Sequence, residues 1–205
     1  MCIATMATVF GGLDFDMMVE RSNNNKYPPK TSLVTRSNPC FSGECWIKLA
    51  NNKSKMLYSL EKGDEVVTPY GPAKIVCILK TLCKNGVAEL VRLKNGLIVT
   101  PWHPVVDCGS WKFPVQLKNP ETISCDAVYS LVLDKYHIVE INRYNCICPG
   151  HNYTQGILKH EYFGSQRVIN DLKNMPGWNE GMIILNSGCL IRGGDIANGL
   201  NYNNS

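Results

Sequence analysis

Long apolar segments are missing from this sequence of 205 residues. No stretch reaches the ~18 consecutive apolar residues that a membrane-spanning helix requires. The N-terminal stretch MCIATMATVFGGLDFDMM holds two glycines and two aspartates and no basic group, which is unlike a secretory signal peptide. We therefore expect no membrane partner and an intracellular, cytoplasmic protein.

Charge of one sign is not concentrated anywhere in the chain either. Lys and Arg together number 21 and Asp and Glu 17, which gives a formal net charge of +4. The basic residues are scattered and do not form the stripe that a nucleic-acid-binding surface requires. We expect no nucleic-acid partner.

The ten cysteines lack the regular spacing of a disulfide framework. In a chain without a secretory signal, reduced thiols are favoured over disulfides. Several stand in apolar runs, as Cys77 does in AKIVCILK, where cysteine packs as a small hydrophobic residue.

Helical periodicity is nearly absent, and short β-type runs take its place. Such runs, separated by turn signals that include Asn-Gly, predict an all-β fold. One exception, SQRVINDLKNM, has Val168, Ile169, Leu172 and Met175 at the spacing of a short amphipathic helix. The β-type runs are CWIKLA, DEVVTPY, AKIVCILKTL, AELVRL, LIVTPWHPVVD, AVYSLVL and HIVEIN.

These patterns divide the chain into three parts. Residues 1–36 end in a polar segment rich in Asn, Ser and Pro, and we interpret them as an N-terminal extension or linker. Residues 37–152 form the β-rich core. Residues 153–205 form a C-terminal extension that carries the short helix and ends in a frayed tail.

Cys40 stands where the polar linker ends and the first strand begins, in SNPCFSGECWIKL. The peptide bond before it is thereby presented at a domain edge, where the thiolate can attack the Pro39 carbonyl. This acyl shift from nitrogen to sulfur turns an amide into a less stable thioester. It therefore requires a base, an acid and a fixed geometry.

A second set of chemical groups lies in LIVTPWHPVV. Thr100 and His103 share one short segment that Pro101 and Pro104 stiffen. A hydroxyl in this position can orient a peptide bond while the imidazole protonates its nitrogen.

The order of these motifs resembles the Hint superfamily, which includes inteins, bacterial intein-like domains and the autoprocessing domain of hedgehog proteins. The motifs are CFSGE, KGDEVVT, NGLIVTPWHPV and AVYSLVLDKYHIVEIN. The resemblance implies a Hint-type horseshoe of short twisted strands with Cys40 as the nucleophile. It also implies that Thr100 and His103 activate the scissile bond and that His137 assists the second step.

Over residues 37–185 the chain is most similar to the Hint domains attached to von Willebrand A-type and U-box proteins. The similar sequence segments are GPAKIVCILKT, TPWHPV followed by W-x-FP, and Gly-His followed by H-x-YFG.

The chain departs from the intein pattern in three places. Inteins end in His-Asn before Cys, Ser or Thr, whereas Tyr follows His151-Asn152, so we expect no full splicing. Ser130 stands where inteins usually carry an aspartate, and Asp134 shares its strand face only if no bulge intervenes. Pro39 restricts the backbone at the Pro39–Cys40 peptide bond, which must twist during the acyl shift. This restriction either slows the acyl shift or strains the bond in a way that favours it.

The resemblance thus implies autoprocessing in cis, without a cofactor or metal. Cys40 attacks the preceding carbonyl while Thr100 and His103 hold and protonate the amide. His137 accepts the thiol proton or activates the incoming group. Water, or an external thiol or amine, then resolves the thioester and releases residues 1–39, the chain's own substrate.

A zinc site is one alternative. Cys146, Cys148 and His151 are closely spaced ligand types, and Cys125 or His160 would have to supply the fourth ligand.

Two further alternatives concern the same domain. Cys40 and His103 are the residue types of a cysteine hydrolase that acts on other proteins. The domain is otherwise a degenerate Hint fold that serves as a protein-interaction module.

Overall fold

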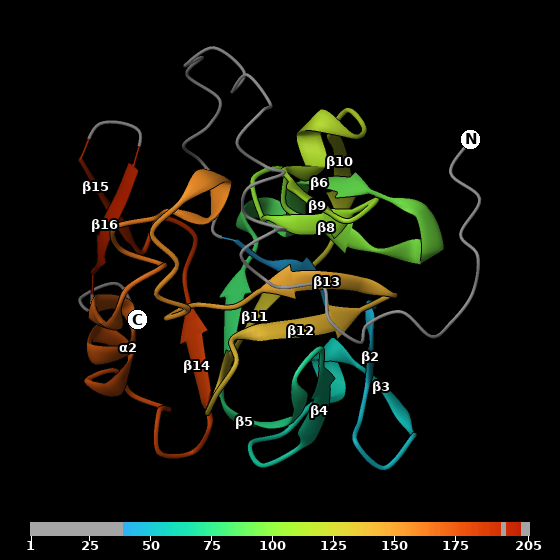
Figure 1. Cartoon of the computed structure of the whole chain (residues 1–205). Helices are drawn as coiled ribbons and strands as arrows, with labels where there is room; N and C mark the ends of the chain where they lie inside the picture. The colour runs from blue at the N-terminus through green and yellow to red at the C-terminus, as the bar shows by residue number, and fades with distance from the viewer. Residues whose placement is uncertain (1–38, 194–195, 202–205) are drawn as a thin grey trace.

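The computed structural model describes residues 39–193 and 196–201 and has the predicted all-β fold (Figure 1). The expected N-terminal extension, residues 1–36, lies outside the described residues. No helix in the described ranges is long and apolar enough to cross a membrane. The strands are β1 (Phe41–Ser42), β2 (Trp46–Lys48), β3 (Ser54–Met56), β4 (Glu65–Thr68), β5 (Gly71–Leu82), β6 (Val87–Arg92), β7 (Ile98–Val99), β8 (Val105–Asp107), β9 (Ser110–Lys112), β10 (Glu121–Ser124), β11 (Ala127–Leu133), β12 (Ile138–Ile141), β13 (Tyr144–Ile147), β14 (Met182–Leu185), β15 (Leu190–Gly193) and β16 (Ile196–Leu200). The helices are η1 (Leu57–Ser59), η2 (Lys84–Gly86), η3 (Lys94–Gly96), η4 (Pro114–Gln116), η5 (Gly156–Leu158) and α2 (Gln166–Lys173).

Most of these strands belong to two sheets. The larger sheet runs in the order β10-β6-β7-β1-β11-β5-β14, with β4 also paired to β5. The second sheet runs in the order β3-β2-β12-β13-β8-β9, and β15 pairs with β16 alone. β5 is antiparallel to β11 and parallel to β14. This long strand therefore joins the first part of the chain to its last part.

The two Lys-Asn-Gly segments form tight turns, as the Asn-Gly dipeptides predict. Asn85 and Asn95 have φ angles of 57° and 58°, in the left-handed region that asparagine and glycine tolerate best. The first turn connects β5 to β6, and the second connects β6 to β7.

The apolar run LIVTPWHPVVD is not one strand. β7 ends at Val99 and β8 begins at Val105, and these two strands belong to different sheets. Pro101 and Pro104 explain the break, because proline has no N–H to donate to a strand ladder. The break matters for function because Thr100 and His103 lie within it.

Two hydrophobic cores lie on opposite sides of the β5–β11 pair. Ile78 and Leu131 face each other and belong to the first core. Their neighbours Cys77 and Val132 also face each other but belong to the second core. This follows from the strand geometry, in which successive side chains point to opposite faces.

The C-terminal elements cover the second core. Helix α2 begins where predicted, with Ser165 as its N-cap, and buries Val168, Ile169 and Leu172. In Figure 1 α2, β14 and β16 lie together on the same side of β5 and β11. The division at residues 152 and 153 stays a prediction, although β14 shares a sheet with the predicted core.

The predicted frayed tail is wrong for residues 196–200, which form β16 and pair with β15. The physical reason is burial, since Ala197 and Leu200 pack into the second core. The Gly and Asn residues around them had indicated a frayed segment.

Candidate functional site

Two hydrogen bonds join Cys40 to Thr100 and fix the candidate scissile peptide. The Cys40 N–H donates to Thr100 Oγ1 at 3.0 Å, and the Thr100 N–H donates to the Cys40 carbonyl at 2.9 Å. Both residues are buried. The Cys40 N–H belongs to the amide that follows Pro39. The Thr100 hydroxyl therefore holds the nitrogen that an acyl shift must release.

The turn that begins at Thr100 places His103 beside the same peptide. The His103 N–H donates to the Thr100 carbonyl at 3.2 Å, and its ring packs on Phe41 with centroids 4.2 Å apart. His103 Nε2 lies 2.7 Å from the carbonyl oxygen of Ile147. Because a carbonyl oxygen only accepts, Nε2 carries the ring proton and Nδ1 does not.

Nδ1 of His103 is buried and has no hydrogen-bond partner among the described residues. Burial lowers the pKa of His103 from 6.5 to about 4, although the backbone carbonyl of Ile147 and the backbone of Cys40 both favour the charged ring. The ring is therefore neutral at pH 7. Its basic nitrogen can take up a proton beside the backbone of Cys40.

The thiol of Cys40 is protonated at neutral pH. Burial raises its pKa well above the ordinary value of 9.0, the Thr81 hydroxyl opposes this by favouring the thiolate, and Cys189 and Cys83 add smaller increases. Because the thiolate is the nucleophilic form, attack on the Pro39 carbonyl needs a base.

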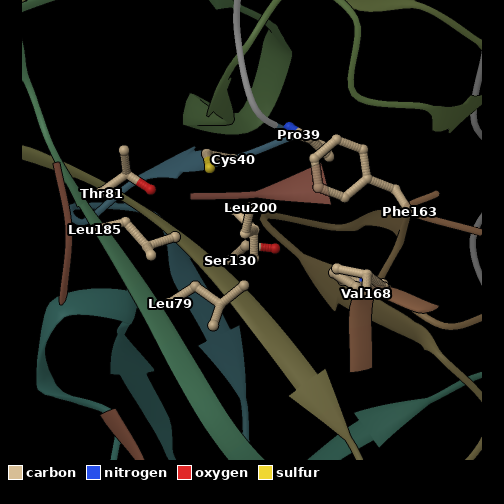
Figure 2. A pocket seen from close by; sticks show the side chains of 10 residues that line it. Pro39, Cys40, Leu79, Thr81, Ser130, Phe163, Val168, Leu185 and Leu200 are labelled. Carbon is tan, nitrogen blue, oxygen red and sulfur yellow. The ribbon is translucent and has the colours of Figure 1, made fainter. Parts of the chain in front are cut away.

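A small pocket opens at Cys40 (Figure 2) and has room for about one water molecule. Thr81 and Ser130 contribute hydroxyl groups to its wall. Both residues are more than nine-tenths buried, with 8% and 3% of their surfaces exposed. The other lining residues are Pro39, Leu79, Pro149, Phe163, Val168, Leu185 and Leu200.

Thr81 has no signature in the sequence, where it stands near the end of the apolar run AKIVCILKTL. Strand alternation is the signal that could have found it. Leu79 and Thr81 are two residues apart on β5 and face the same side of the sheet. Ser130 of β11 is paired with Leu79, so its side chain points to that side too.

His137 lies in the turn between β11 and β12, with a φ of 47°. Burial lowers its pKa, and Asp134 and the backbone of Pro149 oppose this. Its Nδ1 is buried without a hydrogen-bond partner in the described part of the chain. His137 does not line the Cys40 pocket, but Pro149 does. The structure thus brings Cys40 to Thr100 and His103, whereas His137 is connected to the pocket through Pro149.

Asp134 does not replace the carboxylate that inteins carry at the position of Ser130. The register of β11 on β5 shifts between Val132 and Leu133, which is the kind of irregularity that changes the strand face. Asp134 Oδ1 accepts the N–H of Lys74 at 2.8 Å and is not part of the pocket wall.

The H-x-YFG motif shapes the loop that leads to the pocket. His160 Nδ1 accepts the N–H groups of Tyr162 and Phe163 at 3.2 and 3.1 Å. A Cβ on Gly164 would lie 2.6 Å from the His160 carbonyl oxygen and 3.0 Å from His151 Cε1, so a side chain does not fit there. These contacts set the position of Phe163 in the pocket wall. They give both histidines a structural role.

The zinc interpretation finds no support in the described residues. Cys146 is buried in the first core, where its Sγ contacts the Tyr144 carbonyl oxygen at 3.4 Å. Across residues 39–193 and 196–201, no group of three His, Cys, Asp or Glu side chains is placed to hold a metal ion.

The interpretation as a hydrolase of other proteins is not supported either. Cys40 is 2% exposed, and the pocket at its side chain has room for about one water molecule. A peptide substrate from another chain does not fit into this space.

Comparisons with known proteins identify the family. No curated protein sequence matches the chain. The chain is similar to the crystal structure of the gp41-1 intein, with 12% identity, 54% of this chain and 99% of that chain covered, and a TM-score of 0.42. It is also similar to a DnaB intein from Synechocystis sp. PCC 6803, with 19% identity, 54% and 99% coverage and a TM-score of 0.42. The family model described as Vint, a Hint-domain, matches residues 39–196, in agreement with the predicted Hint-type fold. Because this match spans well over half of the chain, the protein belongs to the Vint family of Hint domains.

Proposed function

We propose that this domain cleaves its own chain at the Pro39–Cys40 bond through a thioester. The observation that carries the proposal is the pair of hydrogen bonds between Cys40 and Thr100, with the neutral ring of His103 beside the same peptide. These groups supply the orientation and the acid–base chemistry that an acyl shift from nitrogen to sulfur requires.

The first step moves two protons. Cys40 Sγ faces the pocket lined by Thr81 and Ser130, where a water molecule takes its proton, and the resulting thiolate attacks the Pro39 carbonyl carbon. As the carbon–nitrogen bond breaks, His103, which contacts the Cys40 backbone, relays one proton from solvent to the departing nitrogen. The products are a thioester between the Pro39 acyl group and Cys40 Sγ, and a free α-amino group on Cys40.

Thr100 acts by alignment in this step. Its hydroxyl oxygen accepts the Cys40 N–H, which fixes the direction in which the nitrogen lone pair develops when the amide loses its planarity. Its own N–H holds the Cys40 carbonyl, so residue 40 cannot rotate away from His103. A rigid turn that holds both sides of one peptide lowers the entropic cost of the reaction.

The second step releases residues 1–39. Water or an external thiol or amine attacks the thioester, and the carbon–sulfur bond breaks. His137 is the candidate to assist this step, since its ring contacts the backbone of Pro149 and Pro149 also lines the pocket. Full splicing is not part of the proposal, because Tyr153 follows His151-Asn152.

The finer relationship is also a proposal. We assign the chain to the branch of Hint domains that accompanies von Willebrand A-type and U-box domains. The H-x-YFG motif of that branch has a structural explanation in this chain, because His160 and Gly164 fix the conformation of the loop.

The test compares the wild-type chain with Cys40→Ala, and with Cys77→Ala as the control for loss of a buried cysteine. Each chain is expressed and incubated with and without hydroxylamine, which cleaves thioesters. We expect the wild type and Cys77→Ala to release the N-terminal fragment and Cys40→Ala to remain intact. A wild type that stays intact with hydroxylamine contradicts the proposal and favours an interaction module.

A further inference from the structure

The pocket beside Cys40 carries two hydroxyl groups on the face of the sheet that holds the sulfur. Phe41 pairs with Tyr129 across β1 and β11, so Cys40 lies next to Ser130 in the same register. Ser130 in turn pairs with Leu79, and Thr81 follows on the same face of β5. Figure 2 shows Cys40, Thr81 and Ser130 around one space.

One of these hydroxyls has the Cys40 sulfur as its neighbour. Thr81 Oγ1 is fully buried, lies close enough to Cys40 to favour the thiolate, and makes no other hydrogen bond with the described residues. A buried hydroxyl that is not fully hydrogen-bonded is costly. A water molecule in the pocket would satisfy it, and buried waters are held in this way by two to four polar groups.

The remaining wall is apolar and leaves little space. Leu185, the strand neighbour of Thr81, lines the pocket together with Leu200 and Phe163, and the pocket has room for about one water molecule. Pro39 also lines this space. The acyl group that becomes the thioester therefore borders the same pocket as the hydroxyls.

We infer that this pocket is the site of the acyl acceptor, that the acceptor is water, and that Thr81 and Ser130 position it. The inference rests on the proposed function. The water oxygen bonds to the Pro39 carbonyl carbon and the carbon–sulfur bond breaks. One water proton passes to the sulfur, which restores the Cys40 thiol, and Pro39 ends in a carboxylic acid. Thiols and amines as large as glutathione are excluded because the apolar wall leaves them no room.

The experiment follows the full chain in cell-free synthesis in water enriched in oxygen-18, with glutathione present as a large competing thiol. Mass spectrometry identifies the new end of the released fragment. We expect one oxygen-18 in a carboxylic acid at Pro39 and no glutathione adduct. In Leu200→Ala, the enlarged pocket admits glutathione and the adduct accumulates.

Thr81→Val tests the positioning role, because it keeps the shape of the side chain and removes the hydroxyl. Because the Thr81 hydroxyl also favours the Cys40 thiolate, the substitution slows thioester formation too, so hydrolysis of the thioester is timed separately. We expect the thioester, once formed, to persist about ten times longer, the effect of one lost hydrogen bond, as a species that hydroxylamine cleaves. Thr81→Ser restores the rate. Thr68→Val removes a buried hydroxyl elsewhere, one that binds the Gly71 carbonyl, and leaves the rate unchanged.

The outcomes separate the two proposals. A glutathione adduct on the wild-type fragment, or hydrolysis of Thr81→Val at the wild-type rate, overturns the water site and leaves the acyl shift at Cys40 intact. Absence of any cleavage that depends on Cys40 contradicts the proposed function and the water site with it. If Thr81→Val does not fold, Ser130→Ala replaces it, with the same slowing expected.

Discussion

The hydrogen bond from the Cys40 N–H to Thr100 Oγ1 is the contact whose loss has the clearest consequence. Thr100→Val keeps the side-chain shape and removes only this bond of 3.0 Å. The bond from the Thr100 N–H to the Cys40 carbonyl is made by the backbone and remains. The substitution therefore loosens the scissile nitrogen without releasing the rest of residue 40.

The size of the effect follows from the burial of the Cys40 N–H, which Thr100→Val leaves without an acceptor. An N–H left buried without a partner costs about 1–3 kcal/mol, and we expect the free energy of unfolding to fall by that amount. If about 2 kcal/mol of alignment is also lost from the transition state, thioester formation slows roughly 30-fold. Both effects come from the same lost bond.

The two effects are measured separately. Unfolding by urea is followed in a Cys40→Ala background, which keeps the N–H but prevents cleavage. The cleavage rate is followed by gel electrophoresis of the otherwise unchanged chain. Thr100→Ser keeps an acceptor oxygen and is expected to cleave close to the wild-type rate.

Thr68→Val is the matched control, because Thr68 is buried and binds the Gly71 carbonyl where β4 meets β5, and it does not line the Cys40 pocket. It should lower stability without slowing cleavage. Equal cleavage rates for Thr100→Val, Thr68→Val and the wild type would refute the alignment role of Thr100.

The remaining predictions concern stability. Burial lowers the pKa of His103 from 6.5 to about 4 in the folded chain. Above pH 6.5 the ring is therefore neutral in both the folded and the unfolded chain. Between pH 6.5 and 4 only the unfolded chain takes up a proton at this residue. Thermal melts of an uncleavable variant should therefore lose about 3 kcal/mol of stability between pH 6.5 and 4 from this residue, and His103→Gln should flatten the slope. Oxidation with diamide should join Cys83 to Cys125, whose sulfurs lie 3.4 Å apart across a separation of 42 positions, and raise stability in urea by about 4 kcal/mol relative to the reduced chain. Gly164→Ala would place a Cβ 2.6 Å from a backbone oxygen and should cost about 1–3 kcal/mol, whereas Gly199→Ala, with only ordinary contacts at 3.4 Å or more, should cost less; equal losses in urea unfolding would contradict this.

The elements that local patterns specify were predictable from the sequence. The runs AKIVCILKTL and AVYSLVL became β5 and β11, and the helical spacing around Val168 became α2. β14 did not stand out, because its parallel pairing with β5 joins segments about a hundred residues apart. β16 was missed because its strand character depends on burying Ala197 and Leu200 in a core that other segments build.

The candidate site likewise contains residues that sequence motifs predict and residues that only the packing of the folded chain places. The order of motifs, which resembles that of the Hint superfamily, predicted that Cys40, Thr100 and His103 would meet, and the structure places them in contact. Thr81 could not be predicted, since a threonine inside an apolar run has no pattern of its own. The position of His137 depends on how a left-handed turn packs against Pro149, which a linear motif does not specify.

The most direct test of the central claim is mass spectrometry of the chain after brief treatment with hydroxylamine. Attack on a thioester at Cys40 would give a fragment of residues 1–39 with a hydroxamate on Pro39, and a second fragment that begins with an unmodified Cys40. We expect both masses in the wild type and neither in Cys40→Ala. An unmodified full-length mass in both chains, or cleavage at any other bond, would contradict it.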